Sequence, residues 1–399
     1  MDRKDLILGG FGLAFDAVEG VTDIVEGMHR NIAASPLDEA PRGRAPGIAG
    51  LVYACVRGVN SVVRGGVRHA LAQTALPEGQ RETSREPWLA ALNGVLGDHL
   101  DQSANPLAIA MRWRVDGHEL PTDEAGLRAA IRDPRSRVLL LVHGLCMNDL
   151  QWTRTREDGS RHDHGLALAS ALAATPLWLH YNSGRHISTN GRELARQLQQ
   201  LAEAWPVPLR TITLLGHSMG GLVIRSALRV AEDDGAAWLA KVDRAFYLGS
   251  PHHGAALERA GNRLQAMVAW SRYSAPLAGL GAIRSAGITD LRHGNVVDAD
   301  WDSVERFAHH EDRRRTTPLA VGPEHFAIAG TLSPAPTGLI ADLLGDGMVH
   351  PSSATGRHRD PARTLAFGER HVRIVPATGH LELLSSADVY AQLEQWLGA

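Results

Sequence analysis

The 399-residue sequence lacks several features that define whole classes of proteins. It has only two cysteines, Cys55 and Cys146, so no disulfide framework is expected and a reducing compartment is the default. The formal net charge is -3 and no long basic run occurs, which argues against nucleic acid as a partner. No signal peptide and no membrane-spanning apolar run is apparent. These absences favour a cytoplasmic location.

Apolar residues make up 44% of the chain and charged residues 21%, which is the balance of a globular protein. Apolar residues recur at helical spacing over 5–30, 48–73 and 87–100, so we expect residues 1–105 to form a helical N-terminal region. Two roles for residues 1–100 stay open. They form either an appendage packed on the main domain or an amphipathic surface for a membrane or a homo-oligomeric partner.

Residues 106–399 are expected to form one α/β domain. A nearly continuous apolar run at 137–144 is typical of a parallel strand buried on both faces, and strand and helix patterns alternate from there to the end. This alternation predicts a mostly parallel sheet covered by helices on both faces. In such sheets ligands bind beyond the carboxyl ends of the strands.

The segment at about 255–320 is too long for a simple crossover, so we expect it to include a helical cap over the site. Six of its apolar residues are candidates for an acyl pocket or for the core of the cap itself: Met267, Val268, Trp270, Leu277, Leu280 and Ile283.

The pattern Gly-x-Ser-x-Gly occurs at Gly216, Ser218 and Gly220, between a β-rich run and an amphipathic run. In that context it predicts a strand, a tight turn and a helix that hold the serine in an exposed, strained position. The glycines permit the sharp turn and the close passage of helix and strand. The alternative is a serine that only caps the helix.

A serine hydroxyl needs a base within hydrogen-bond reach, and the base needs a third group that fixes its tautomer. His380 follows the last predicted strand and is the best candidate for the base. The acid is expected between serine and histidine in the chain. Asp346, which lies between two glycines, is the first choice, and Asp342 is the alternative.

An oxyanion hole requires two backbone N–H donors near the developing charge. We expect one from Met219, directly after the nucleophile, and one from Leu145 in the loop after strand 137–144, with Cys146 as the alternative. Other polar residues at the same edge of the sheet are candidates for substrate binding, or for ordering their loops: His143, His217, Asn182, His186, His252 and His253.

Five motifs in 137–399 carry a family resemblance: His143-Gly144-Leu145, 216–221, 248–254, 346–349 and Gly379-His380-Leu381. Together they resemble a serine hydrolase of the α/β-hydrolase fold, of lipase or esterase type. The last four resemble bacterial triacylglycerol lipases and the GPI inositol-deacylase-like proteins. The resemblance implies Ser218 as nucleophile, Asp346 as acid and His380 as base.

The resemblance also bears on metals, because some of these lipases hold a structural calcium near the histidine loop. Glu382 lies at such a position, but no second carboxylate matches, so no metal and no cofactor is expected.

The sequence therefore predicts a carboxylic-ester hydrolase that acts on a small-molecule or lipid ester through an acyl-enzyme. An acyltransferase or thioesterase acting on lipid or polyester is the alternative with the same machinery. A membrane- or partner-binding protein with an idle hydrolase domain is the alternative from another class. The presence of all the catalytic residues counts against it.

Overall fold

The computed structural model describes residues 3–33, 47–73, 86–156, 158–255, 285–302, 312, 314, 316–338, 341 and 344–398. It divides into two compact units. One comprises Met1–Thr83 with Gln102–Ala108, and the other comprises Ser84–Asp101 with Ile109–Ala399.

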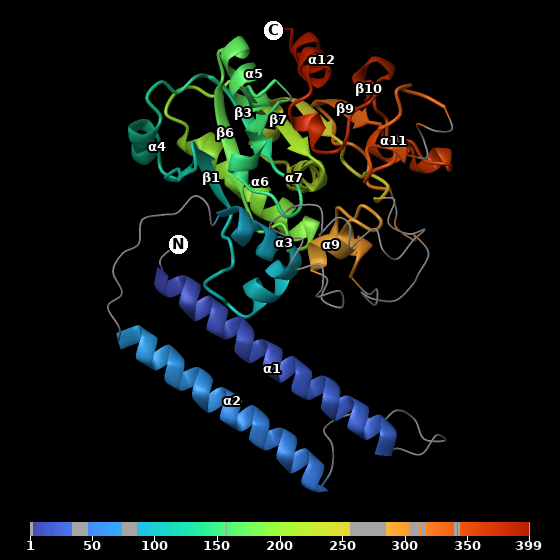
Figure 1. Ribbon diagram of the computed structural model, residues 1–399. Coiled ribbons are helices and arrows are strands. Elements are labelled where there is room, and N and C mark those ends of the chain that lie inside the picture. The colour runs from blue at the N-terminus through green and yellow to red at the C-terminus, as the bar shows by residue number, and fades with distance from the viewer. Residues whose placement is uncertain are drawn as a thin grey trace. The chain divides into compact units, whose positions relative to one another are not determined.

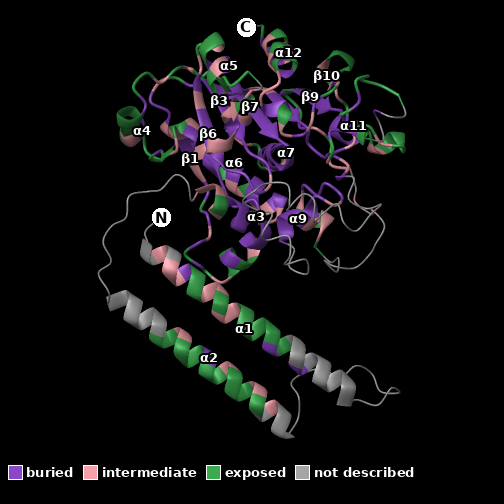
Figure 2. Ribbon diagram, in the orientation of Figure 1, coloured by how far each residue is buried: buried purple, intermediate pink, exposed green. Residues whose placement is uncertain are grey.

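The first unit is built from two long helices that pack against each other, α1 (Arg3–Ala33) and α2 (Gly47–Gln73) (Figure 1). Polar groups lie between them. Arg57 pairs with Glu26 and, at 2.6 Å, with Asp23, and Arg64 lies 2.5 Å from Asp16. Much of α2 is exposed (Figure 2). Its exposed apolar residues are Val52, Val56, Val59, Val62 and Val63. The two helices are therefore joined by ion pairs, and the valines of α2 are exposed.

The second unit contains an eight-stranded sheet in the order β10-β9-β8-β7-β3-β6-β1-β2. Six of these strands are parallel, while β1 is antiparallel to β6 and to β2. The strands are β1 Arg112–Val115, β2 His118–Glu119, β3 Arg137–Val142, β6 Thr175–His180, β7 Thr211–His217, β8 Val242–Leu248, β9 Glu324–Gly330 and β10 Val372–Val375. A separate short hairpin joins β4 (Arg154–Thr155) to β5 (Arg161–His162).

Helices cover both faces of this sheet (Figure 1). The helices described in this unit are α3 Glu86–Gln102, α4 Glu124–Ala130, α5 His164–Leu172, α6 Ile187–Ala204, α7 Met219–Asp234, α9 Ala286–Asp290, α11 Pro351–Ala354 and α12 Ala387–Leu397. Alternate residues of β3 pack on opposite faces of the sheet. Val138 and Leu140 lie in the hydrophobic core formed with α6 and α7, and Leu139 and Leu141 lie in the core formed with α5 and α12. Because both faces are buried, the strand reads as one apolar run. The predicted α/β fold is confirmed.

The structure bears on two of our expectations, the extent of the N-terminal region and the cap. Helix α3, which we assigned to the region 1–105, belongs to the sheet-containing unit, where the Asn93 side chain accepts the Ile109 N–H at 2.9 Å. The division of the chain thus differs from a boundary at 105/106. The expected cap falls mostly on 256–284 and 303–311, so its six apolar candidates lie outside the described residues.

Among the helices the structure describes, none is long and apolar enough to cross a membrane.

Candidate active site

Ser218 sits at the junction of β7 and α7 with φ 54° and ψ -124°, a conformation that non-glycine residues rarely adopt. Its N–H donates to Leu248 O at 2.8 Å, which ties the turn to β8. A Cβ at Gly216 would lie 2.6 Å from Gly221 N, and one at Gly220 would lie 2.1 Å from Val142 O. The glycines are therefore required by the close passage of helix and strand, as a nucleophile elbow requires.

His380 and Asp346 form a short, buried hydrogen bond. His380 Nδ1 lies 2.6 Å from Asp346 Oδ2, and the two residues are 2% and 3% exposed. A carboxylate can only accept, so Nδ1 carries the proton and Nε2 is the basic nitrogen. The other oxygen of Asp346 accepts the N–H groups of Met348 and Val349 at 3.0 and 2.8 Å, which fixes the carboxylate.

Several contacts bring this pair to the elbow. The imidazole of His380 packs on Gly249, where a Cβ would lie 3.1 Å from both Nδ1 and Cε1. Gly249 directly follows Leu248, whose carbonyl binds the Ser218 N–H. The rings of His217 and His380 have centroids 4.8 Å apart, and His217 Nε2 donates to His380 O at 3.0 Å. The loop that carries His380, here called the histidine loop, is thus bonded to His217, the residue directly before Ser218.

The loop after β3 also adjoins the serine, because a Cβ at Gly144 would lie 3.1 Å from Ser218 Cβ. In the described part of the chain, the backbone N–H groups of Leu145 and Met219 donate to no other group. The Cys146 N–H instead donates to Ser183 Oγ at 3.1 Å. The Cys146 N–H is therefore already bonded within the protein, whereas the Leu145 N–H is available to another acceptor.

His143 shapes this loop. Its Nδ1 donates to Gly144 O at 2.9 Å, its carbonyl accepts the Tyr181 hydroxyl at 2.8 Å, and the two rings stack with centroids 4.3 Å apart. Burial lowers the pKa of His143 to about 3 and holds the pKa of His217 well below its usual value. Both imidazoles are therefore neutral at physiological pH.

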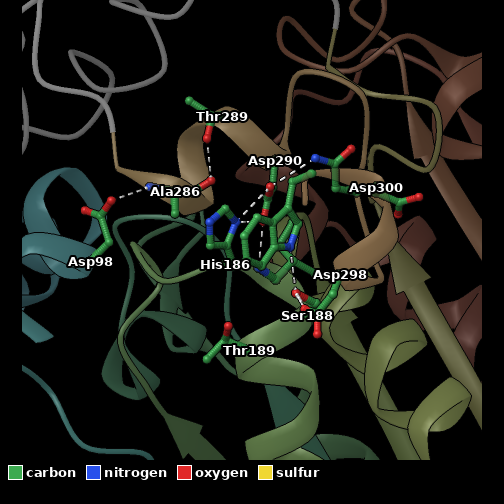
Figure 3. A network of polar contacts seen from close by, with 12 residues as sticks. Asp98, His186, Ser188, Thr189, Ala286, Thr289, Asp290, Asp298 and Asp300 are labelled. Carbon is green, nitrogen blue, oxygen red and sulfur yellow. Dashed lines mark hydrogen bonds and ion pairs between the residues drawn. The ribbon is translucent and has the colours of Figure 1, made fainter. Parts of the chain in front are cut away.

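Asn182 and His186 make a different set of contacts. The Asn182 side chain accepts the Gly184 N–H at 3.0 Å and donates to Gly97 O at 2.8 Å. His186 Nδ1 donates to Asp290 at 3.1 Å, and its ring stacks on Trp301 with centroids 3.7 Å apart and planes 7° apart (Figure 3). These contacts order the loop that carries Asn182 and His186, and they hold residues 285–302 against the start of α6.

Figure 3 shows the other polar contacts of this network. Asp290 also accepts the Ile187 N–H at 2.8 Å, and Ser188 Oγ donates to Asp298 at 2.6 Å. The indole N–H of Trp301 donates to the same Ser188 hydroxyl at 3.0 Å. This network is separate from the contacts of Ser218 and His380.

His252 and His253 line a cavity beside α7 together with Arg225, which our sequence analysis did not single out. The only signal in the sequence is a charged residue directly after the apolar run 222–224. Glu382, considered for calcium, accepts the Gly379 N–H at 2.6 Å and so closes the histidine loop.

The comparisons with known proteins agree with this fold. Residues 133–327, just under half of the chain, match the model of the family described as the PGAP1-like alpha/beta domain. The chain therefore carries a domain of the α/β-hydrolase fold, as the resemblance implied. No curated protein sequence matches it.

Solved structures similar to the chain include lipases and an esterase. The mature lipase BlEst2 of Bacillus licheniformis is 18% identical, with 72% of this chain and 97% of that chain covered and a TM-score of 0.40. The esterase of Pyrobaculum calidifontis is 12% identical, with 66% and 76% covered and a TM-score of 0.39. The lipase of Staphylococcus hyicus is 13% identical, with 67% and 97% covered and a TM-score of 0.37.

Proposed function

We propose that the protein is a serine carboxylic-ester hydrolase in which Ser218, His380 and Asp346 form the catalytic triad. The observation that carries the proposal is the buried 2.6 Å bond between His380 Nδ1 and Asp346, packed against the strained turn of Ser218. A serine nucleophile requires a base that is held in a fixed orientation by a third group. A serine or histidine without a catalytic role has no such requirement.

In the proposed reaction, His380 Nε2 takes the proton of Ser218 as its Oγ attacks the ester carbonyl. The developing oxyanion accepts hydrogen bonds from the N–H groups of Leu145 and Met219. The tetrahedral intermediate collapses, His380 protonates the departing alcohol, and an acyl-enzyme forms at Ser218. Water, activated by the same nitrogen, then releases the acid.

The test combines turnover with labelling. We expect a burst of p-nitrophenol from p-nitrophenyl esters of several chain lengths, and covalent labelling by a fluorophosphonate. Ser218→Ala should abolish both. Ser170→Ala, an exposed serine on α5, is the matched control and should change neither.

Each other outcome identifies an alternative. Hydrolysis that is equal in Ser218→Ala removes Ser218 as the nucleophile. Turnover that rises with added alcohol, or a strong preference for thioesters, indicates the acyltransferase or thioesterase. The absence of both burst and labelling indicates an idle hydrolase domain.

We also propose that the helices α1 and α2 provide a contact surface, which is one of the two roles left open for residues 1–100. What supports this is the row of exposed valines on α2, of which Val62 is 75% exposed. Sedimentation of the full-length protein, with and without lipid vesicles, separates a membrane contact from a homo-oligomer. A cytoplasmic location stays a prediction.

A further inference from the structure

The turn that carries Leu145 contains a residue in an unfavourable backbone conformation. The Met147 N–H donates to Gly144 O at 3.4 Å, and Cys146, the third residue of this turn, has a φ of 59°. A turn with a positive φ at its third residue ordinarily has glycine or asparagine there. Cysteine has a Cβ, so the left-handed backbone is strained. The turn therefore depends on contacts with the rest of the protein.

Ser183 provides the first of these contacts. The Cys146 N–H donates to Ser183 Oγ at 3.1 Å, and the two residues are 5% and 1% exposed. This bond fixes the peptide group between Leu145 and Cys146. That peptide group would have to rotate for Cys146 to reach a negative φ. The rotation would leave the buried N–H without its acceptor, so the bond to Ser183 opposes it.

Gly94 of α3 provides the second contact. A Cβ at Gly94 would lie 2.9 Å from both the Cα and the N of Cys146. Only a residue without a side chain therefore leaves room for the turn against this helix. On the other side of the turn, a Cβ at Gly144 would lie 3.1 Å from Ser218 Cβ. The turn is thus held between α3 and Ser218 with little free space on either side.

Ser183 is itself held on α3. The preceding residue, Asn182, donates from its side chain to Gly97 O at 2.8 Å and accepts the Gly184 N–H at 3.0 Å. A Cβ at Gly184 would lie 2.7 Å from Gly97 N, so the backbone of this loop also packs directly on the helix. Helix α3 therefore fixes both the turn and the serine that bonds to it.

We propose that Ser183 and Gly94 are positioning residues for the oxyanion hole. By holding Cys146 in its left-handed conformation, they keep the Leu145 N–H beside Ser218, where the negative charge of the tetrahedral intermediate develops. They act through the turn and touch none of the reacting atoms. This inference rests on the proposed function and extends it to the residues that maintain one oxyanion donor.

Steady-state hydrolysis by the full-length protein tests Ser183 first. Ser183→Ala should lower kcat about tenfold to a hundredfold and leave KM within about twofold, because the oxyanion bonds form fully only in the transition state. Ser188→Ala is the matched control, since Ser188 is also a buried serine, and its hydroxyl donates to Asp298. It should leave kcat and KM unchanged. A wild-type kcat in Ser183→Ala overturns the proposal.

A thionoester, in which sulfur replaces the carbonyl oxygen, separates positioning from a general loss of structure. Sulfur accepts hydrogen bonds more weakly than oxygen, so an intact oxyanion hole favours the oxygen ester. The ratio of kcat for the oxygen ester to kcat for the thionoester should fall in Ser183→Ala and stay unchanged in Ser188→Ala. An equal loss for both esters in Ser183→Ala overturns the positioning role and indicates a structural one.

A double-mutant cycle tests whether Ser183 acts through the backbone of Cys146. Glycine adopts a positive φ without strain, so Cys146→Gly removes the strain that the bond to Ser183 opposes. The loss of kcat caused by Ser183→Ala should therefore be at least about threefold smaller in the Cys146→Gly background than in the wild-type background. Equal losses in the two backgrounds overturn the link through Cys146.

Gly94→Ala tests the contact with α3. The added methyl group should push the turn toward Ser218 and lower kcat about tenfold or more. Gly58→Ala is the matched control, because a Cβ at this glycine of α2 meets nothing within 4 Å, and it should leave kcat unchanged. An unchanged kcat in Gly94→Ala overturns the role of Gly94. If Gly94→Ala does not fold, Ser183→Ala, which removes a single oxygen, decides the proposal.

The wild-type protein separates this inference from the proposed function. If the wild type hydrolyses esters and is labelled at Ser218, but Ser183→Ala is equally active, the inference fails and the esterase assignment stands. If the wild type neither hydrolyses esters nor is labelled, the proposed function fails and the inference fails with it.

Discussion

Two of the histidine–aspartate pairs in the described part of the domain differ in their surroundings. His380 and Asp346 are both buried, bonded at 2.6 Å, and packed against the turn of Ser218. His186 and Asp290 are bonded at 3.1 Å, and the His186 ring is stacked on Trp301 and partly exposed. The first pair adjoins a strained serine, and the second joins two segments of the chain.

The comparison teaches that a histidine–carboxylate bond does not define a catalytic base. The carboxylate of Asp290 also accepts from the Ile187 N–H and from the Asn295 side chain, as expected of a group that anchors a loop. The carboxylate of Asp346 is fixed by two backbone N–H groups, and the basic nitrogen of its histidine is the one turned from that carboxylate. Position relative to a nucleophile decides the role.

The largest expected effect separates the two pairs directly. Asp346→Asn should lower kcat for ester hydrolysis about 10⁴-fold, because an amide no longer enforces the tautomer that leaves Nε2 basic. Asp290→Asn should leave kcat within about twofold and lower the free energy of unfolding by about 1–3 kcal/mol. Steady-state kinetics and urea unfolding of both variants test this. Equal losses of kcat would remove the distinction between the pairs.

Acidification should act on the buried histidines around the catalytic pair. Burial lowers the pKa values of His143 and His164 to about 3, and His164 Nε2 supports the histidine loop through Leu383 O at 2.9 Å. At pH values between 3 and 6.5 the unfolded chain binds protons that the folded chain does not, so stability falls as pH falls.

Between about pH 7.5 and about pH 5.5 the two groups together should cost about 3 kcal/mol of unfolding free energy. Urea unfolding at both pH values measures this loss, and His143→Phe should reduce the pH dependence. A stability that does not change over this range would contradict the buried, neutral assignment.

Gly249 and Gly235, which both have a positive φ, allow a second comparison. A Cβ at Gly249 meets the His380 ring at 3.1 Å and Leu383 Cδ1 at 2.8 Å, whereas a Cβ at Gly235 meets nothing within 4 Å. Gly249→Ala should displace His380 and lower kcat about 10²-fold. Gly235→Ala should cost only about 1 kcal/mol of stability, from the left-handed backbone. A kcat unchanged in Gly249→Ala would show that His380 is not held there.

The smallest expected effect concerns the bond from His217 Nε2 to His380 O. His217→Phe should lower kcat/KM about two- to tenfold, because one neutral hydrogen bond that positions the histidine loop is lost. His118→Phe, at an exposed residue of β2, is the control. A shift of the pH–rate profile in His217→Phe would distinguish a positioning role from general loss of structure.

The sequence predicted the central strand well because a parallel strand buried on both faces appears as an unbroken apolar run, as in residues 138–142 of β3. The chain order of the strands predicted that Ser218, Asp346 and His380 lie at one edge of the sheet. The start of helix α6 at Ile187 is harder to predict, because its first turn is polar and Ser188 and Asn190 are buried there by hydrogen bonds.

Other features depend on tertiary contacts that no local pattern reveals. Periodicity assigns a charged residue such as Arg225 to a solvent-facing position, but the structure buries it against the loop after β8. His186 resembled a ligand-binding residue because it follows a strand, and only the fold brings Asp290 and Trp301 to it from a hundred residues away.

The pairing of α1 and α2 has a consequence for how the two units respond to ionic strength. Ion pairs such as Arg64–Asp16 lie between the helices while valines face outward, the reverse of the sheet-containing unit. Added salt screens ion pairs, and sulfate or phosphate strengthens apolar association. Concentrated salts should therefore loosen the contact between the two helices and promote association through their valines, while the same salts stabilise the apolar core around the sheet.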